Sequence, residues 1–265
     1  MVGFSVTIVL LTRPTQRMPQ ADLTAGPVEI IDGANVPAAV PPESRLDHLV
    51  PVASFWHMAA VLALIGSSAY RGWANVGRIR LSPDRIAIYE RTILFEWLGL
   101  GLVFVGLWLR GTPLIAVMGE RWRSAGQFFR DLGFGILFLV LTIFISSIAG
   151  PHGGDDGATQ FLLPQARMEM FLWVLLSLSA GICEEAVYRG YLQKQFATLT
   201  GNIPAGIIIS AVVFGAAHSY QGLGHAAVIS LLGALAGVLA WWRRTVRPGM
   251  IAHTLQDVLG GFLRH

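Results

Sequence analysis

The chain has 265 residues, of which 54% are hydrophobic and only 13% are charged, with a mean hydropathy of +0.58. Soluble domains carry roughly 25% charged residues, so this composition excludes an ordinary soluble protein and indicates an integral membrane protein. The net charge of +3 does not indicate nucleic-acid binding, because the basic residues are scattered between apolar runs instead of gathered in one patch.

The N-terminal segment has a different composition from the rest. Residues 13–50 are polar, lack a regular hydrophobic pattern and contain six prolines. Such a segment cannot bury enough apolar surface to offset the entropy of ordering. Residues 1–50 are therefore predicted to be a disordered N-terminal extension.

Seven apolar runs follow, and most approach the roughly 20 residues that a helix needs to span a bilayer. A shorter apolar segment, 113–119, is predicted to be a further short helix or an interfacial turn. The fold class is thus all-α, a polytopic transmembrane bundle with about seven or eight spans. We divide it into N-terminal helices (51–124) and a C-terminal core (125–265). The seven runs are 51–70, 92–109, 132–149, 168–196, 203–219, 225–242 and 249–263.

Charged joints between the runs indicate an orientation. Three basic joints, around residues 110–130, 189–194 and 243–247, fall on one side of a seven-helix model, which the positive-inside rule assigns to the cytoplasm. The acidic loop "GPHGGDDGATQ" (150–160) falls opposite, whereas the arginines between 71 and 91 run against the rule. We expect a polar cavity to open on the side of the 243–247 joint. Arginine replaces lysine at every basic position except Lys194, a bias typical of GC-rich bacterial genomes.

Six ionisable residues interrupt the apolar runs of the C-terminal half. An ionisable residue at the centre of a span costs roughly 2.5–3.5 kcal/mol on insertion scales, and such residues usually face a bundle interior or a cavity. They are therefore expected to line an intramembrane polar cavity. The six are Glu184, Glu185, Arg189, His218, His253 and Asp257.

The spacing of these residues separates their roles. Glu185 and Arg189 are i,i+4 neighbours in the favourable order and neutralise each other. Glu184 points about 100° away on the same helix and is free to meet groups from other helices. His253 and Asp257 are also i,i+4 neighbours.

A carboxylate and a histidine from separate helices can hold a water between them, with the carboxylate taking its proton. A second histidine and a polar partner can then stabilise the developing oxyanion. This constellation describes amide hydrolysis. Each motif alone fits an ordinary ion pair or a packing histidine, but their joint occurrence on three helices favours a site. No further motif residue accompanies three other ionisable residues, and we interpret them as structural or interfacial: Glu96, His57 and His225. The single cysteine, Cys183, is interpreted as a packing residue.

Three segments resemble the motifs of a known family. "EEAVYR" (184–189), "FGAAH" (214–218) and "HTLQD" (253–257) are similar, in order, to the motifs EExxxR, FxxxH and HxxxN/D of the CPBP family. This family comprises CAAX prenyl proteases of type II and bacteriocin-processing or immunity-type (Abi-like) membrane proteins. The resemblance covers residues 125–265.

The resemblance implies a glutamate-type intramembrane protease. Glu184 and His218 would activate the water, and His253 and Asp257 would form the oxyanion site. Glu185, Arg189 and Phe214 would be structural at the site. The prenyl-protease branch usually has asparagine at the position of Asp257, which weakens the expectation of a prenylated substrate.

The implied substrate is a peptide or protein, with or without a lipid group, in the bacterial cytoplasmic membrane. We expect no cofactor. The alternative within the same fold is a zinc-dependent protease with the metal on His218, His253 and Glu184. A second alternative is a non-catalytic immunity or scaffold protein. A proton-coupled carrier is disfavoured, because the two halves show no repeat.

Overall fold

The polar breaks between the apolar runs carry residues that end one helix and begin the next. Gly201, with φ of +63°, ends α7 (Gln193–Thr200) in the left-handed conformation that glycine adopts without strain. The Asn202 side chain then accepts a 2.9 Å hydrogen bond from the Ala205 N–H and caps α8 (Ile203–Ala217). Asp84 caps α2 (Arg85–Leu109) in the same way. These local signals place consecutive helices side by side in opposite directions.

The computed structural model describes residues 49–81, 83–149 and 160–263, and over these residues its regular secondary structure is helical, with no strand. The expected all-α fold is thereby confirmed. The predicted extension, residues 1–50, lies almost wholly outside the described residues. The segment 113–119 contains a single helical turn, α3. The remaining helices are α1 (Phe55–Leu81), α3 (Ile115–Met118), α4 (Ala125–Ala149), α6 (Arg167–Glu184), the π-helix η1 (Glu185–Leu192), the 3₁₀ turn η2 (Ser219–Gln221), α9 (Leu223–Arg243) and α10 (Arg247–Leu263).

Among the residues that the structure describes, four helical segments are long and apolar enough to cross a membrane, and α8 is a shorter apolar helix. The protein is therefore an integral membrane protein with a helical bundle fold. The first helix extends eleven residues beyond the predicted run, to Leu81, and two arginines of this extension contact aromatic rings. Arg71 lies over the ring of Phe95, and Arg80 lies over the ring of Phe161. The four segments are Arg85–Leu109, Ala125–Ala149, Arg167–Thr200 and Leu223–Arg243.

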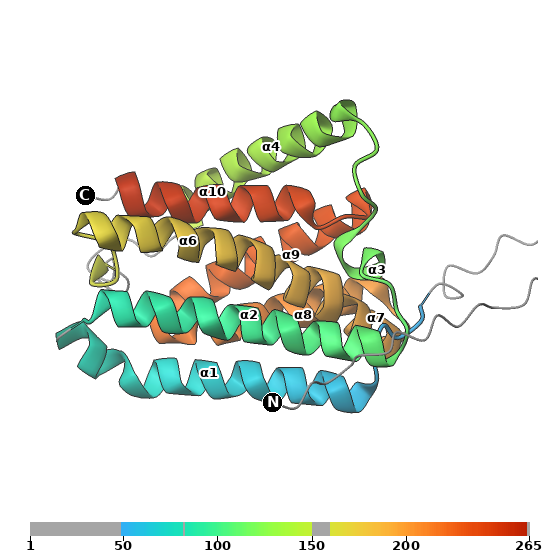
Figure 1. Ribbon diagram of the computed structural model, residues 1–265, viewed down its shortest axis with the longest axis horizontal. Helices are drawn as coiled ribbons and strands as arrows, with labels where there is room; N and C mark the ends of the chain where they lie inside the picture. Colours follow the sequence, from blue (N-terminus) through green and yellow to red (C-terminus); the bar gives the residue numbers. More distant parts are fainter. Residues whose placement is uncertain (1–48, 82, 150–159, 264–265) are drawn as a thin grey trace, which may run out of the picture. The chain divides into compact units, whose positions relative to one another are not determined.

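The helices of the compact unit Ser44–His265 pack in pairs along much of their length (Figure 1). α8 lies against α7 and α9, α10 lies against α4 and α6, and α2 lies against α6. Small residues bring these helices close together. A Cβ added at Gly181 would lie 2.1 Å from Thr254 Oγ1, and one at Gly206 would lie 2.6 Å from the backbone N of Ala197.

Two sets of contacts define the two ends of the bundle. At the α1–α2 end (residues 78–91 and 160–169), Arg85 Nε donates to the carbonyl of Phe161 at 3.0 Å. At the α9–α10 end (residues 110–124, 193–200 and 243–247), Thr245 Oγ1 donates to the carbonyl of Met118 at 3.1 Å. The three basic joints grouped by sequence therefore share one end, and the arginines of 78–91 lie at the other.

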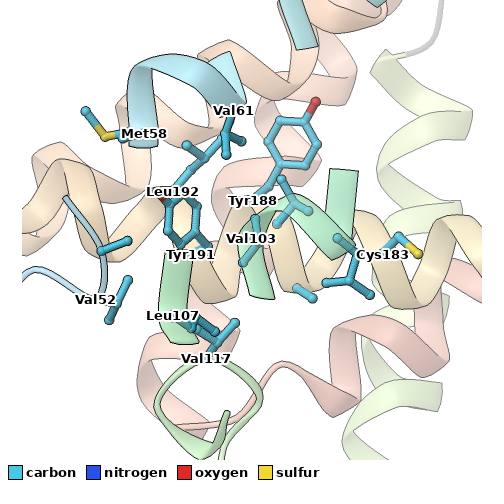
Figure 2. Packing of buried hydrophobic residues seen from close by; sticks show 14 of the residues in the cluster. Val52, Met58, Val61, Val103, Leu107, Val117, Cys183, Tyr188, Tyr191 and Leu192 are labelled. Carbon is cyan, nitrogen blue, oxygen red and sulfur yellow. The ribbon is translucent and has the colours of Figure 1, made fainter. Parts of the chain in front are cut away.

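The apolar core lies where α1, α2 and α3 meet η1 (Figure 2). His57 connects these elements: its Nε2 donates to the carbonyl of Leu102 at 2.8 Å, so its Nδ1 accepts from the Tyr191 hydroxyl at 2.7 Å. The structural interpretation of His57 is confirmed. Cys183 is 1% exposed within this core, as expected of a packing residue.

Candidate active site

The first motif straddles a change of helix type. Glu184 is the last residue of α6, and Glu185 is the first residue of η1. The N–H of Gln193 donates to the carbonyl of Tyr188, which is the i→i+5 bond of a π-helix. All eight residues of η1 are buried. Such π-helical turns are frequent at functional sites.

Glu185 and Arg189 form the predicted ion pair. Arg189 Nη1 lies 2.9 Å from Glu185 Oε1, and both side chains are 3% exposed. The guanidinium also lies over the ring of Phe214, 4.2 Å from its centroid. Gly249 leaves the room for this carboxylate, since a Cβ there would lie 2.7 Å from Glu185 Oε2. Glu185 is thus neutralised within η1, whereas Glu184 has no partner within its own helical segment.

His253, on α10, lies among three carboxylates. Its Nδ1 is 3.3 Å from Glu185 Oε1, and its Nε2 is 3.7 Å from Glu184 Oε2 and 3.6 Å from Asp257 Oδ2. A carboxylate only accepts hydrogen bonds when ionised, so both ring nitrogens are placed to donate. The surrounding negative charge favours the imidazolium form. His253 therefore joins α6, η1 and α10 electrostatically.

His218 follows the last residue of α8 and turns its ring back onto that helix. Its Nδ1 donates to the carbonyl of Phe214 at 2.8 Å, so in the neutral ring Nε2 carries the lone pair. The ring stacks on Tyr220 with centroids 6.3 Å apart and meets the edge of Phe214 at 4.8 Å. Phe214 also lies 6.2 Å from the ring of His253. One aromatic side chain thus separates the two histidines.

A cavity of about 870 Å³ contains Glu184 and His218 in its wall. Its lining comes from α1, α2, the α6–η1 junction and the end of α8. His253 and Asp257 are not among the lining residues; they lie beside the wall, where His253 contacts Glu184. The structure therefore joins five of the six ionisable residues through charged contacts and connects the sixth, His218, to them through the ring of Phe214. Two of the six, Glu184 and His218, line the cavity.

The cavity reaches the surface at the end opposite to the one expected. Its lining includes the exposed residues Arg78, Asp84 and Arg91, all at the α1–α2 end. A separate pocket of about 530 Å³ at the α9–α10 end contains Arg189 and Arg244 but not Glu184. The expected opening beside the 243–247 joint is wrong. The reason is that the cavity forms where α1 and α2 face the α6–η1 junction and the end of α8, and the sequence pattern carries no signal for this packing.

Glu96 is a lining residue that the sequence analysis placed among the structural or interfacial ones. It lies on α2, in the same cavity wall as Glu184, and its buried Oε2 has no hydrogen-bond partner among the described residues. An ionisable residue within a span is a functional candidate by default, and that signal was present in the sequence. No second motif residue accompanies Glu96 on α2, so the sequence pattern alone does not distinguish it from a structural residue.

The residues proposed for zinc do not fit a metal site as they are arranged. A zinc-bound imidazole offers a nitrogen lone pair about 2.0–2.1 Å from the metal, yet both nitrogens of His253 face carboxylates. His218 Nε2 alone is free to offer one. Over the residues that the structure describes, there is no group of three or more His, Cys, Asp or Glu side chains placed to hold a metal ion.

These features define a class of protein: a helical membrane bundle with carboxylates and histidines gathered at an internal cavity. Residues 166–259 match the family model of the type II CAAX prenyl endopeptidase Rce1-like proteins. The matched segment contains all three motifs, and the match supports their resemblance to the CPBP/CAAX protease family. No curated protein and no solved structure matches the chain. The family implies CAAX-type intramembrane protease activity on peptide or protein substrates.

Proposed function

We propose that this protein is a glutamate-type intramembrane endopeptidase in which Glu184 and His218 activate the attacking water. The observation that carries this proposal is their shared cavity wall: one carboxylate and one imidazole from separate helices face the same space. Glu185 is excluded from the role of base, because Arg189 already neutralises it. Glu184 is left as the carboxylate available for proton transfer.

In the proposed reaction, Nε2 of His218 accepts a hydrogen bond from the water, and Glu184 takes a proton as the oxygen attacks the peptide carbonyl. The tetrahedral intermediate carries a negative charge on the former carbonyl oxygen. The C–N bond then breaks, and Glu184 returns its proton to the leaving nitrogen. A carboxylic acid and an amine are the immediate products, the acid then loses its proton to water, and one water is consumed for each bond cleaved.

His253 and Asp257 are assigned to the oxyanion. The imidazolium form of His253 supplies positive charge next to Glu184, and its Nε2–H lies between Glu184 and Asp257. A substrate oxygen that approaches Glu184 would find this donor within reach. The 3.7 Å approach of Nε2 to Glu184 supports a further task for His253, which is to orient the catalytic carboxylate before substrate binds.

The experiment that tests this function compares peptide termini in membranes that contain wild-type protein, the Glu184→Gln variant or no protein. New termini that appear only with the wild type support the protease. If the wild type and Glu184→Gln give the same termini and the same cellular phenotype at equal protein levels, the scaffold function of the same fold replaces it. No described contact favours the scaffold over the enzyme.

A further inference from the structure

A second cavity, of about 530 Å³, lies at the α9–α10 end of the bundle, separate from the one that contains Glu184. Its charged lining residues are Arg189, Lys194 and Arg244, and no acidic residue belongs to its lining among the residues that the structure describes. Arg189 is already neutralised by Glu185, so Lys194 and Arg244 supply the free positive charge. We name this cavity the basic pocket. Its charge and its volume suit a small anionic group.

Arg244 has a backbone conformation that favours glycine. It follows the last residue of α9 with a φ of +54°, and among the described residues it is the one non-glycine residue with a positive φ. A glycine usually occupies such a position, because it has no Cβ to strain. The neighbouring Arg243 and Arg247 bind Asp131 and the carbonyl of Gly119, whereas the Arg244 guanidinium has no such partner within the described part of the chain. A strained residue without a structural contact points to a function of its side chain.

Helix length places Arg244 at the level of the lipid headgroups. α9 has 21 residues, which is about 31 Å at 1.5 Å per residue and close to the roughly 30 Å thickness of the hydrocarbon core. The residue that follows α9 therefore lies just outside the hydrocarbon. Trp241 lines the basic pocket and is 51% exposed. Tryptophan is enriched at the membrane–water interface, which agrees with this depth.

Lys194 is held at the basic pocket by α3. Its Nζ donates to the carbonyl of Ala116, which uses one of the three N–H donors of an ammonium group and leaves two for a ligand. α3 in turn packs closely on η1, since a Cβ at Gly190 would lie 2.5 Å from Val117 Cγ1. An anion bound by Lys194 therefore contacts a part of the bundle that supports η1. Because a ligand stabilises the folded state that binds it, such binding should raise the thermal midpoint.

The uncharged part of the lining is mostly apolar. It includes Val52 before α1, Ile203 at the start of α8 and Ala240 on α9. Apolar walls cannot replace the hydrogen bonds that a fully hydrated phosphate loses when it leaves water. They do suit the first methylene groups of an acyl chain, with the phosphate at the basic residues. Basic pockets between transmembrane helices bind anionic headgroups in this way.

We propose that the basic pocket binds the phosphate of an anionic phospholipid through Lys194 and Arg244. A soluble phosphate ester presents the same charge, and the apolar lining favours the lipid. The proposal is independent of the protease chemistry, because Glu184, His218, His253 and Asp257 do not line this pocket.

The test measures quenching of tryptophan fluorescence by brominated phospholipids in bilayers that contain the purified protein. The chain has eight tryptophans, so the signal of Trp241 is obtained as the difference between each protein and its Trp241→Phe form. Brominated phosphatidylglycerol, which is anionic, is compared with brominated phosphatidylcholine, which is neutral overall. The anionic lipid should bind the wild type at least about tenfold more tightly, as expected for two basic residues.

The Lys194→Gln/Arg244→Gln double variant should lose this preference. Arg110→Gln/Arg121→Gln is the matched control, since it removes the same charge from exposed residues at the same end that do not line the pocket. The control should keep the wild-type preference. An unchanged preference in the first variant, or an equal loss in both, would overturn the site, because the charge of the whole face would then account for the binding.

Arg244→Gly separates lipid binding from folding. Glycine adopts the left-handed conformation without strain, so this variant should keep the wild-type thermal midpoint in neutral bilayers. Phosphatidylglycerol should raise the midpoint of the wild type and not that of Arg244→Gly. A lower midpoint of Arg244→Gly in neutral lipid would instead make Arg244 a structural residue and contradict the proposal.

Glycerol phosphate distinguishes the lipid from a soluble anion. Added to the wild type at an ionic strength matched with chloride, it should not displace brominated phosphatidylglycerol from Trp241. Displacement down to the quenching seen with neutral lipid would assign the basic pocket to a soluble phosphate ester and overturn the lipid site. No arm of the experiment measures peptide cleavage, so the result does not depend on the proposed protease function.

Discussion

Glu184 Oε2 lies 3.7 Å from His253 Nε2, across the contact between α6 and α10. The two residues are 69 positions apart in sequence. Glu184 also lies in the cavity wall, so the same side chain faces the ring of His253 on one side and the cavity on the other. The base that we propose is held in this way and needs little reorganisation when a water binds.

Glu184→Gln should therefore abolish peptide cleavage while leaving protein accumulation close to wild type. The glutamine keeps the size of the side chain and removes only the proton acceptor, and no buried arginine loses its partner. A loss of at least about 10²-fold is expected for removal of a general base. Cleavage rates are measured on protein quantified by immunoblot. Cleavage close to the wild-type rate would contradict the assignment of Glu184 as the base.

Glu185→Gln should have the opposite phenotype, a loss of folded protein. Arg189 would then be buried without its anionic partner, which costs roughly 3–5 kcal/mol in protein interiors. Thermal stability in detergent and the amount of protein in the membrane fraction report the effect. Glu184→Gln is the matched control, one residue away. Normal accumulation of Glu185→Gln together with loss of Glu184→Gln would reverse the two roles.

Substitution of Asp257 separates an oxyanion function from a merely structural one. Asp257→Asn keeps the shape and gains an amide donor, so cleavage should stay within about tenfold of the wild type. Asp257→Ala removes the acceptor that faces the Nε2–H of His253, and loss of a correctly oriented oxyanion donor costs about 10²–10³ in kcat. Kinetics of both variants are compared at equal protein concentration. Equal activities for the two would show that Asp257 does not act on the oxyanion.

Chelation should leave the activity unchanged. Both nitrogens of His253 face carboxylates and are placed to donate hydrogen bonds rather than to coordinate an ion. Purified protein is incubated with a chelator, dialysed and assayed, and its zinc content is measured by elemental analysis. Loss of cleavage that returns on addition of zinc would favour the metal-dependent alternative on His218, His253 and Glu184.

The close packing of α7 and α8 should not tolerate one added methyl group. A Cβ at Gly206 would lie 2.6 Å from the backbone N of Ala197 and from the carbonyl oxygen of Gln193, so the helices would have to separate. Overpacking of this kind typically costs 1–3 kcal/mol. Gly206→Ala should lower the thermal midpoint, whereas Gly101→Ala, with nothing within 4 Å, should not. Equal thermal midpoints for the two variants would mean that α8 can move away from α7 without loss of stability.

The sequence was most informative where a residue type is costly in lipid. Glu184, His218 and His253 stand out because each interrupts an apolar run, and in the structure His253 contacts Glu184 directly and is connected to His218 through the ring of Phe214. The opening of the cavity could not be predicted, because it depends on how α1 and α2 pack against the other helices, and that packing has no motif. Glu96 was not predicted for a related reason. It lies on α2, a helix that carries none of the three motifs, and its place in the cavity wall depends on the packing of α2 against α6.

The π-helix also escaped prediction, since its hydrophobic pattern is indistinguishable from that of a continuous α-helix, and it makes the segment intolerant of insertions and deletions. Removing one residue between Glu185 and Leu192 would let the backbone return to α-helical hydrogen bonds, so the local cost would be small. A deletion between Glu185 and Arg189 would also change the i,i+4 spacing of this buried ion pair. The number of residues in η1 therefore fixes the geometry of the pair that lies next to Glu184, and homologues that share this site should align through residues 184–192 without a gap.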